Sequence, residues 1–517
     1  MQAEPDRTAF LGRFHGEEGY RRVARREWEE LSEHIARGLR DRFAVDRGTK
    51  VAWLLDNRSA GEALSLYQAV HRLGAVNVPI STRLARPEIE HILRHSEASV
   101  CLFDDATAER SVSAIEATLG LAAAVVVGDA SGSVSTTLGE LVELGRRAAP
   151  CTAARIDEHT DAVILYTSGT TGRPKGVLLS QANVVASGIA WADALRLGPD
   201  DVFQAPFPIF SGAGLHYTAM AALFAGAAFI VDDHETEHSL RMLEREQTTV
   251  CAAVPSIYQF WLESPVLATV NVDSVRTLAY GGASMPPSVI TRLRGAFPNA
   301  GLMQTYGLTE AGPGGTYLPE EYALRFLGSI GTRTAGRFTQ VRVVDAAGRD
   351  VGPGTPGELL LRGASVMKEY FNDPEATSAA MPDGWLRSGD VVRFDENGAL
   401  YHLDRKKDII IRGGFNIASS EVESAILNHP SIVDAAVVGR PHDKLGEEVV
   451  AFVVARPGDE VTAEQLLAHC RDLIADFKLP RDIRFCAELP RNAAGKVLKQ
   501  TLREQSHRSE ASVEGES

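Results

Sequence analysis

Short apolar segments alternate with longer segments of helical periodicity through much of the chain. Residues 51–55 form a short apolar run, residues 60–73 place apolar side chains at helical spacing, and residues 75–79 form a second apolar run. Further strand-like runs occupy residues 99–103, 123–127, 227–231 and 249–254. Apolar strands that alternate with helices are typical of mostly parallel sheets. The pattern therefore predicts an α/β fold, with layered α/β subdomains in a large N-terminal domain.

The longest apolar run covers residues 219–231, contains Gly226 and ends at Asp232 and Asp233. A membrane-spanning helix needs about 20 apolar residues, so this run is too short to cross a bilayer. Its glycine predicts a helix end, a glycine stop and then a buried strand. We therefore expect no integral membrane association.

The pattern changes twice in the second half of the chain. Residues 328–362 alternate short strand-like runs with turn signals, which predicts a small β-rich subdomain. Residues 404–408 read DRKKD, and after them a new α/β unit is predicted, with helices at 419–427 and 463–474 and strands at 435–438 and 449–455. The predicted domains are therefore residues 1–403 and 409–517, and the polar segment after Glu504 is expected to be a frayed tail.

Size and charge narrow the class of protein. With 517 residues the chain exceeds what one hydrophobic core usually supports, so at least two domains are expected. The formal charge of −15 argues against a nucleic-acid partner. The five cysteines are scattered and form no CxxC pair, and the N-terminal sequence lacks the features of a secretory signal. We expect a cytoplasmic protein with reduced, mostly buried thiols.

One segment has the composition of a phosphate-binding loop. Residues 166–177 read YTSGTTGRPKGV, and they differ in spacing from the common nucleotide-triphosphate loop. Glycines let the backbone approach an anion closely, hydroxyls and N–H groups donate hydrogen bonds, and the lysine adds a positive charge. The flanking apolar runs predict a strand on each side of the loop. The expected nucleotide-binding residues here are Thr167, Ser168, Gly169, Thr170, Thr171, Gly172 and Lys175.

Several later segments appear in the order found in one known family. These are residues 306–310 (YGLTE), 388–390 (SGD), 404–408 (DRKKD) and 490–496 (PRNAAGK). Together with the loop above, they resemble the adenylate-forming enzymes, which include acyl-CoA synthetases, firefly luciferase and the adenylation domains of peptide synthetases. The similarity covers nearly the whole chain and is greatest to acyl-CoA synthetases. It implies that residues 404–408 are a hinge and that the small α+β C-terminal domain is a mobile lid.

The resemblance also implies a role for individual residues. Glu310 would bind Mg²⁺ and Thr309 would donate to phosphate, although Glu310 capping a helix start is the alternative. Lys496 would be the catalytic lysine, unless it is an ordinary solvated side chain, and Lys407 would be the pivot of the hinge. The other residues implied to contact ATP or coenzyme A are Gly281, Gly282, Ala283, Tyr306, Asp390, Arg405, Gly413 and Gly414.

The segment expected to bind the carboxylic acid departs from the family pattern. Ser211 stands where many relatives have a histidine, and Ala213 stands where a bulky ring is common. Small residues at these positions, with Gly315 nearby, suggest a roomy, mostly apolar cavity for a bulky acid. His216 is a candidate to replace the missing histidine, although a lone histidine is more often structural. The predicted pocket residues are Phe210, Ser211, Gly212, Ala213, Gly214, Gly312 and Gly314.

These interpretations converge on one reaction. We expect an ATP-dependent acyl-CoA synthetase that uses ATP, Mg²⁺ and coenzyme A, forms an acyl-adenylate and releases AMP and pyrophosphate. A second reading is an enzyme that loads the acyl group onto a separate acyl carrier protein. A third is a catalytically inactive binding module, against which the intact set of motif residues argues. The oligomeric state is left open, with a homodimer as one option.

Overall fold

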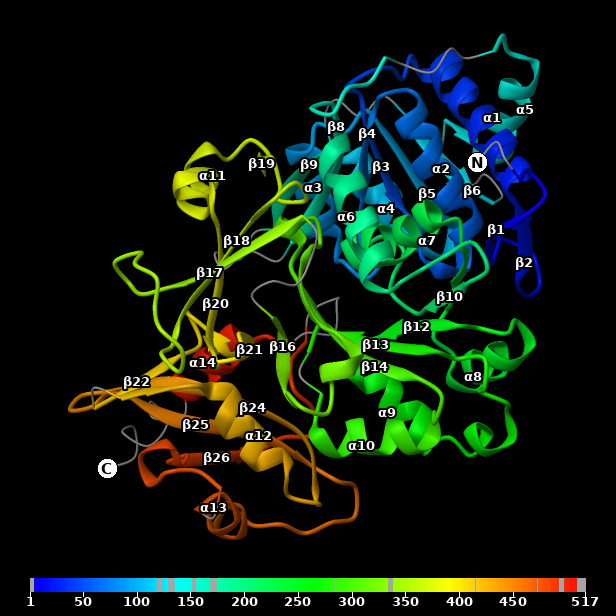
Figure 1. Cartoon of the computed structure of the whole chain (residues 1–517). Coiled ribbons are helices and arrows are strands. Elements are labelled where there is room, and N and C mark those ends of the chain that lie inside the picture. The colour runs from blue at the N-terminus through cyan, green and yellow to red at the C-terminus, as the bar shows by residue number, and fades with distance from the viewer. Residues whose placement is uncertain are drawn as a thin grey trace. The chain divides into compact units, whose positions relative to one another are not determined.

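The structure is a computed structural model of the whole chain (Figure 1). It describes residues 4–118, 123–128, 135–150, 155–167, 174–283, 285–332, 338–413, 415–471, 473–491 and 497–508. The fold is α/β, as the apolar pattern predicted.

The first eight-stranded sheet has the order β19-β9-β8-β4-β3-β5-β6-β7. Its strands are β3 (Lys50–Leu54), β4 (Val76–Pro79), β5 (Val100–Asp104), β6 (Ala123–Val127), β7 (Thr136–Thr137), β8 (Asp161–Thr167), β9 (Lys175–Ser180) and β19 (Glu369–Tyr370). β3 pairs in parallel with β4 and β5, and β5 pairs in parallel with β6. The strands predicted at 51–55, 75–79, 99–103 and 123–127 are confirmed, because each run is buried on both faces.

The second eight-stranded sheet has the order β15-β14-β13-β12-β10-β11-β1-β2. Its strands are β1 (Thr8–Gly12), β2 (Arg21–Ala24), β10 (Val202–Ala205), β11 (Ala228–Val231), β12 (Val250–Ala253), β13 (Thr277–Gly281), β14 (Gly301–Gly307) and β15 (Gly315–Leu318). Strands β10 to β14 are parallel, and β15 runs antiparallel to β14. A hydrophobic core that includes Trp261, Leu278 and Leu293 joins this sheet to its helices.

Helices of this part of the chain pack beside the two sheets (Figure 1). They are α1 (Arg25–Phe43), α2 (Ala60–Arg72), α3 (Arg86–His95), α4 (Ala108–Glu116), α5 (Leu138–Arg147), α6 (Gln181–Ala194), α7 (Met220–Ala225), α8 (Thr236–Arg245), α9 (Pro255–Glu263) and α10 (Pro287–Ala296). The long apolar run is resolved as predicted: α7 ends before Gly226, whose φ of 74° suits a glycine stop, and β11 follows. Within the described residues, no helix is both long enough and apolar enough to cross a membrane.

A third sheet of five strands has the order β16-β21-β20-β18-β17. Its strands are β16 (Ser329–Thr332), β17 (Thr339–Val344), β18 (Gly357–Gly363), β20 (Leu386–Phe394) and β21 (Ala399–Arg405), and α11 (Pro374–Ala380) lies between β19 and β20 in the sequence. The β-rich texture was predicted correctly, but its end at residue 362 was wrong. The sheet takes two more strands from beyond that point, because β20 and β21 lie next to each other and to β18 and β16.

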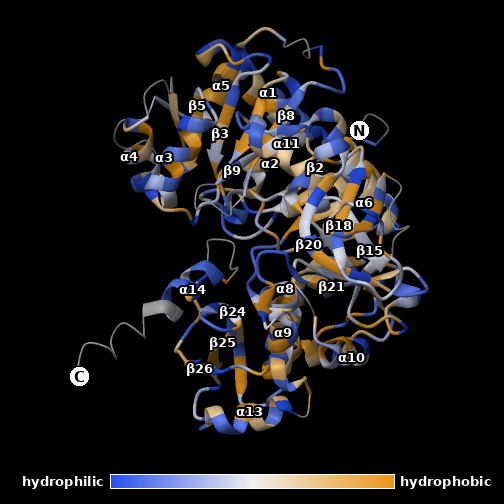
Figure 2. Ribbon diagram, turned by 90° about the vertical axis from the view of Figure 1, so that its left-hand side faces the viewer, coloured by the Kyte–Doolittle hydropathy of each residue, from blue (hydrophilic) through white to orange (hydrophobic). Residues whose placement is uncertain are grey.

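The C-terminal segment forms a mixed sheet with helices. Its elements are β22 (Ile410–Arg412), β23 (Phe415–Ile417), α12 (Ser419–Leu427), β24 (Ile432–His442), β25 (Gly446–Ala455), α13 (Ala463–Arg471), β26 (Asp482–Phe485) and α14 (Lys499–Arg508). Both predicted helices and both predicted strands are confirmed, and α13 carries hydrophilic and hydrophobic residues side by side (Figure 2). The tail predicted after Glu504 was wrong in part, because α14 continues to Arg508 and buries Ser506.

The chain divides into two compact units. The first contains Met1–Arg342, Leu360–Leu386 and Asn397–Leu400. The second contains Val343–Leu359, Arg387–Glu396 and Tyr401–Ser517. The division near Tyr401 lies close to the predicted hinge at 404–408, but the domain limits given above remain a prediction.

Candidate functional site

The strands on either side of the predicted phosphate-binding loop pair with each other in the first unit. β8 and β9 are antiparallel, and Thr167 lies opposite Lys175 at the base of the loop. Ser168, Gly169, Thr170, Thr171 and Gly172 lie outside the described residues. The two predicted strands are therefore confirmed, and the loop between them stays a prediction.

Two histidines of α3 contact the two ends of this loop. His95 Nδ1 lies 2.8 Å from the Tyr166 hydroxyl, and His91 Nε2 donates to the Pro174 carbonyl at 3.3 Å. Burial, and then the neighbouring His91, lower the pKa of His95, which favours its neutral form. The ends of the loop are thus attached to a helix that the motif itself does not include.

Lys175 and Glu310 are joined through a third side chain. The Lys175 ammonium lies 4.8 Å from the centre of the Tyr370 ring, and the Tyr370 hydroxyl donates to Glu310 Oε1 at 3.0 Å. Burial, and then the charge of Glu310, raise the pKa of Tyr370, so its hydroxyl keeps the proton that it donates. Glu310 follows Thr309 in a short 3-10 turn, Thr309–Ala311, rather than at the start of a long helix.

Two of the segments predicted to contact the nucleotide, residues 281–283 and 306–310, lie at or directly after the carboxyl ends of neighbouring parallel strands. Gly281 at the end of β13 lies opposite Thr305 of β14, and Tyr306 follows directly. A side chain at Gly281 would collide with Thr305. The packing of the two strands therefore requires a glycine at this position. The carboxyl ends of parallel strands are where α/β folds usually bind ligands. The structure thus places Gly281, Gly282 and Ala283 next to the Tyr306 segment.

The predicted acid-binding segment leads into a π-helix, Ala213–Ala219. Ser211 shapes its start, because its hydroxyl donates to the Pro208 carbonyl at 2.7 Å and accepts from the Gly214 N–H at 3.0 Å. π-Helical turns are rare and occur frequently at functional sites. Ser211 therefore does more than remove the volume of a histidine.

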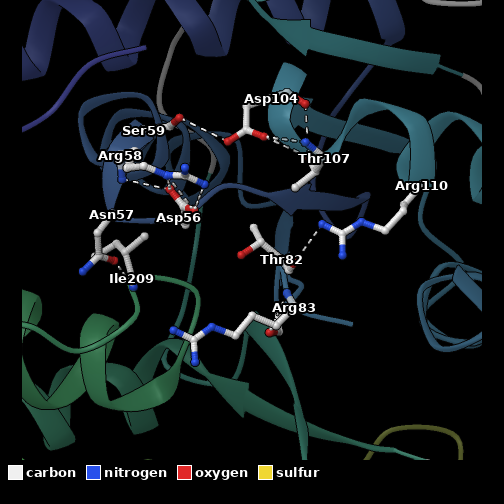
Figure 3. A network of polar contacts seen from close by, with 11 residues as sticks. Asp56, Asn57, Arg58, Ser59, Thr82, Arg83, Asp104, Thr107, Arg110 and Ile209 are labelled. Carbon is white, nitrogen blue, oxygen red and sulfur yellow. Dashed lines mark hydrogen bonds and ion pairs between the residues drawn. The ribbon is translucent and has the colours of Figure 1, made fainter. Parts of the chain in front are cut away.

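Asn57 fixes the chain just before this segment (Figure 3). Its amide nitrogen donates to the carbonyls of Phe207 at 3.0 Å and Asp232 at 2.6 Å, and its oxygen accepts from the Ile209 N–H at 2.8 Å. Asp56 accepts from the Arg58 N–H and stabilises the turn that carries Asn57. A side chain far away in the sequence thus determines the path of the predicted acid-binding segment.

Three glycines of the predicted pocket are needed for close packing of the chain. A side chain at Gly214 would collide with the Pro208 carbonyl, and one at Gly312 would collide with the Ser365 carbonyl. Gly312 also has a φ of 83°, and a Cβ at Gly314 would lie 2.6 Å from Ser365 Oγ. A larger residue at any of these three positions would therefore displace neighbouring atoms, and the roomy cavity for the acid stays a prediction.

His216 is fully buried and lies against Tyr67. Its Nε2 is 2.8 Å from the Tyr67 hydroxyl. Burial lowers the pKa of His216 to about 3, and burial lowers the pKa of nearby His71 to about 4, so both rings are neutral at pH 7. This environment supports the structural interpretation of His216 over a role as a replacement for the missing histidine.

In the second unit, Asp390 and Arg405 form an ion pair. Arg405 Nε lies 2.7 Å from Asp390 Oδ1, and His402 Nε2 lies 3.2 Å from the same oxygen. Asp390 is buried, so these two partners help compensate for the loss of water around its charge. The structure thus brings together Asp390 and Arg405, two of the residues that the family resemblance implies contact the nucleotide.

The charged motif at 404–408 is held mainly inside the second unit. Asp404 is buried and accepts from the Ser419 N–H and hydroxyl at the start of α12. Asp408 accepts from Arg503 of α14, which also donates to the Lys407 carbonyl at 3.1 Å. The Lys407 side chain is exposed and has no hydrogen-bond or ion-pair partner among the residues described.

Gly413 and Gly414, which the family resemblance implies lie beside coenzyme A, belong to the segment that joins the antiparallel strands β22 and β23. Gly413 is exposed with a φ of 58°, and Phe415 in β23 is 56% exposed and stacks on Phe477. Gly414 and Lys496 lie outside the described residues. The roles proposed for all of these residues remain predictions.

The sequence analysis missed several residues that organise the site. They are Asn57, His91, His95, Tyr370, His402 and Arg503. None lies in a recognisable loop motif, and each contacts residues at least 12 positions away in the sequence. The only sequence signal for Tyr370 is an aromatic residue after Lys368 and Glu369, a pattern that any surface strand can have.

Comparison with family models and known proteins identifies the chain. Residues 1–371 match the model described as AMP-binding enzyme, and residues 421–496 match the AMP-binding enzyme C-terminal domain. Among solved structures, ATP-bound MatB from Rhodopseudomonas palustris is similar, with a TM-score of 0.85, 29% identity, and coverage of 97% of this chain and 96% of MatB.

Two curated proteins are similar over nearly their whole lengths. The long-chain-fatty-acid–CoA ligase of Mycobacterium tuberculosis is 35% identical over 466 residues, which cover 90% of this chain and 89% of that protein. The feruloyl-CoA synthase of Amycolatopsis is 34% identical over 482 residues, which cover 92% of this chain and 93% of that protein. The chain therefore belongs to the family of AMP-binding enzymes, the adenylate-forming superfamily that its motifs predicted, and the two curated relatives named here are enzymes that form acyl-CoA.

Proposed function

We propose that this enzyme is an acyl-CoA synthetase that activates a bulky, hydrophobic carboxylic acid with ATP and transfers the acyl group to coenzyme A in the cytoplasm. One observation carries the proposal. In the first unit, the Lys175 ammonium and the Glu310 carboxylate both contact Tyr370, and Thr309 lies next to Glu310 in the same turn. Relatives named as ligases of long-chain fatty and feruloyl acids support the choice of acid.

The first step joins two anions and therefore needs positive charge. The acid carboxylate attacks the α-phosphorus of ATP, the new bond gives acyl-AMP, and pyrophosphate leaves. Lys175 would hold phosphate oxygens as the loop donates its N–H and hydroxyl groups. Lys496 would offset the charge that develops between the carboxylate and the α-phosphate.

The residues around Glu310 fit a magnesium ion. Glu310 is partly exposed and offers carboxylate oxygens, which this hard cation prefers, and Thr309 offers a neighbouring hydroxyl. When bound, Mg²⁺ would neutralise part of the phosphate charge. Asp390 would accept the ribose hydroxyls, oriented by its ion pair with Arg405.

The second step needs no cysteine of the enzyme. The thiol of coenzyme A attacks the acyl carbonyl carbon, the thioester forms, and AMP leaves. Cys101, Cys251 and Cys470 are buried, and burial raises the pKa of each thiol, which suits a structural role. We assign Lys407 the role of pivot and the hairpin with Gly413 and Gly414 the role of passage for the thiol arm.

A pyrophosphate exchange assay tests the first step. Purified enzyme, ATP, Mg²⁺ and labelled pyrophosphate are incubated with acetate, long-chain fatty acids, aryl acids and polycyclic acids in turn. We expect label to enter ATP with at least one bulky acid. Exchange with acetate alone would contradict the proposed acid class, and the absence of exchange with every acid would favour an inactive binding module.

The acceptor is tested with the same acids. We expect acyl-CoA in the presence of coenzyme A, detected by mass spectrometry. Exchange without any acyl-CoA product, but with acylation of a purified carrier protein, would instead support the alternative of a carrier-loading enzyme.

A further inference from the structure

We propose that Tyr370 is a positioning residue that holds Lys175 and Glu310 in register for ATP and its metal ion. This inference rests on the proposed nucleotide site. It assigns to Tyr370, which lies in none of the motifs read from the sequence, a part in the first step of the reaction.

Tyr370 contacts the two charged residues through different parts of its side chain. The face of its ring lies 4.8 Å from the Lys175 ammonium, where the ring quadrupole attracts a cation. Its hydroxyl donates to Glu310 Oε1 at 3.0 Å, a charge-assisted hydrogen bond. A single side chain therefore restrains both the cation that would bind phosphate and the carboxylate that would bind metal.

The backbone around Tyr370 makes the same two connections. The Met367 N–H donates to the Glu310 carbonyl at 2.8 Å, and the Phe371 N–H donates to the Gly176 carbonyl at 2.7 Å. β19 pairs with β9, and Tyr370 lies opposite Val177. Residues 367–371 are thus a bridge between the strand that begins with Lys175 and the turn that carries Glu310.

The bridge is itself anchored to α11. The Tyr370 N–H donates to Thr377 Oγ1 at 2.9 Å, and the Thr377 hydroxyl donates to the Asp373 carbonyl at 2.7 Å. Asp373 caps α11 by accepting from the Ala376 N–H. The backbone is therefore held at Tyr370 by Thr377 and at Phe371 by Gly176. These bonds restrict where the Tyr370 ring and hydroxyl can lie before a ligand binds.

Two substitutions separate the two contacts. Tyr370→Phe keeps the ring near Lys175 but removes the hydrogen bond to Glu310. We expect ATP binding without metal to stay within about twofold, and the magnesium concentration that half-saturates ATP binding to rise about tenfold. Tyr370→Leu removes both contacts, so ATP binding without metal should also weaken, by about three- to tenfold. Both are measured by calorimetry with ATP in EDTA and in a magnesium series.

The matched control is Tyr322→Phe, which removes a hydroxyl from an exposed tyrosine of the same unit. It should change neither the affinity for ATP in EDTA nor the magnesium concentration that half-saturates ATP binding. Thermal unfolding of each variant identifies one that has lost its fold.

A double-mutant cycle tests whether the ring acts through Lys175. If it does, Lys175→Met together with Tyr370→Leu should bind metal-free ATP about as weakly as Lys175→Met alone. A purely structural role for Tyr370 would instead make the two losses multiply.

The outcomes distinguish this inference from the proposed function. Should the unsubstituted enzyme fail to bind ATP, the nucleotide site itself is wrong. Should that enzyme bind ATP and Mg²⁺ while Tyr370→Phe shows an unchanged magnesium dependence, or should the cycle be multiplicative, the role of Tyr370 alone is overturned.

Discussion

The nucleotide motifs of the first unit and the charged motif of the second unit hold their side chains differently. In the first unit, Lys175 and Glu310 are restrained through Tyr370, and Gly312 is packed against Ser365. In the second, Asp404 and Asp408 are tied to neighbouring helices, while the Lys407 side chain extends into solvent. The two motifs thus differ in their cations: Lys175 is restrained by an aromatic ring, whereas the Lys407 side chain is exposed while its backbone carbonyl is held by Arg503.

The largest expected effect concerns Lys496 in the second unit. Lys496→Ala should slow adenylation by about a hundred- to a thousandfold, because a cation no longer offsets the developing charge. Conversion of supplied acyl-adenylate to thioester should be unchanged. The two half-reactions are measured separately, by pyrophosphate exchange and by acyl-CoA formation. An equal decrease in the rates of both half-reactions would contradict the proposal that Lys496 acts in the first step only, as part of a mobile C-terminal domain.

Packing around the glycines of the first unit should matter next. Gly312→Ala should lower the free energy of unfolding by about 2–4 kcal/mol, because the new methyl group meets the Ser365 carbonyl at a positive φ. Gly328 has a similar φ of 80° but nothing within 4 Å, so Gly328→Ala should cost only about 1 kcal/mol. Denaturant unfolding checks both values. Equal losses would mean that backbone strain, and not close packing, accounts for Gly312.

The buried histidines of the first unit should make stability depend on pH. His71 has a folded pKa of about 4 and His216 of about 3, both below the ordinary 6.5. As pH falls below 6.5, the unfolded chain binds protons first, so stability decreases until the folded pKa is reached. The loss should be about 1.4 kcal/mol per pH unit for each histidine, or about 2 kcal/mol each at pH 5.

This dependence is measured by denaturant unfolding between pH 5 and 7. His216→Gln should reduce the slope by about half of the combined histidine contribution. His159→Gln, at a side chain that is 85% exposed, should leave the slope unchanged. An unaltered slope in His216→Gln would argue that this ring is not held neutral by burial.

The smallest expected changes in the free energy of unfolding concern two neighbouring residues of the predicted hinge, Lys407 and Asp408. Lys407→Ala should change the free energy of unfolding by less than about 0.5 kcal/mol, because its side chain is exposed. Asp408→Asn should cost about 1–2 kcal/mol, because it weakens the contact with Arg503. Thermal and denaturant unfolding compare the pair. A larger cost at Lys407 would contradict the view that this side chain is left free.

Local sequence was sufficient for the elements whose signals are contained in a short segment. The buried strands β3 to β6 and the glycine stop at Gly226 were predicted because burial on both faces and a positive φ leave clear local patterns. The limits of the β-rich subdomain and the tail were wrong because strand partners and the packing of α14 involve distant residues.

The sequence by itself determined the fold class, the family and the order of the motifs, because those depend on periodicity and on residue types at fixed spacing. Only the tertiary structure decided how the motif residues are held. It put Tyr370 between Lys175 and Glu310, fixed the predicted acid-binding segment through Asn57, and filled the space beside Gly312 with Ser365. Such contacts join residues far apart in the chain, and neither hydrophobic period nor motif spacing records which distant atoms meet.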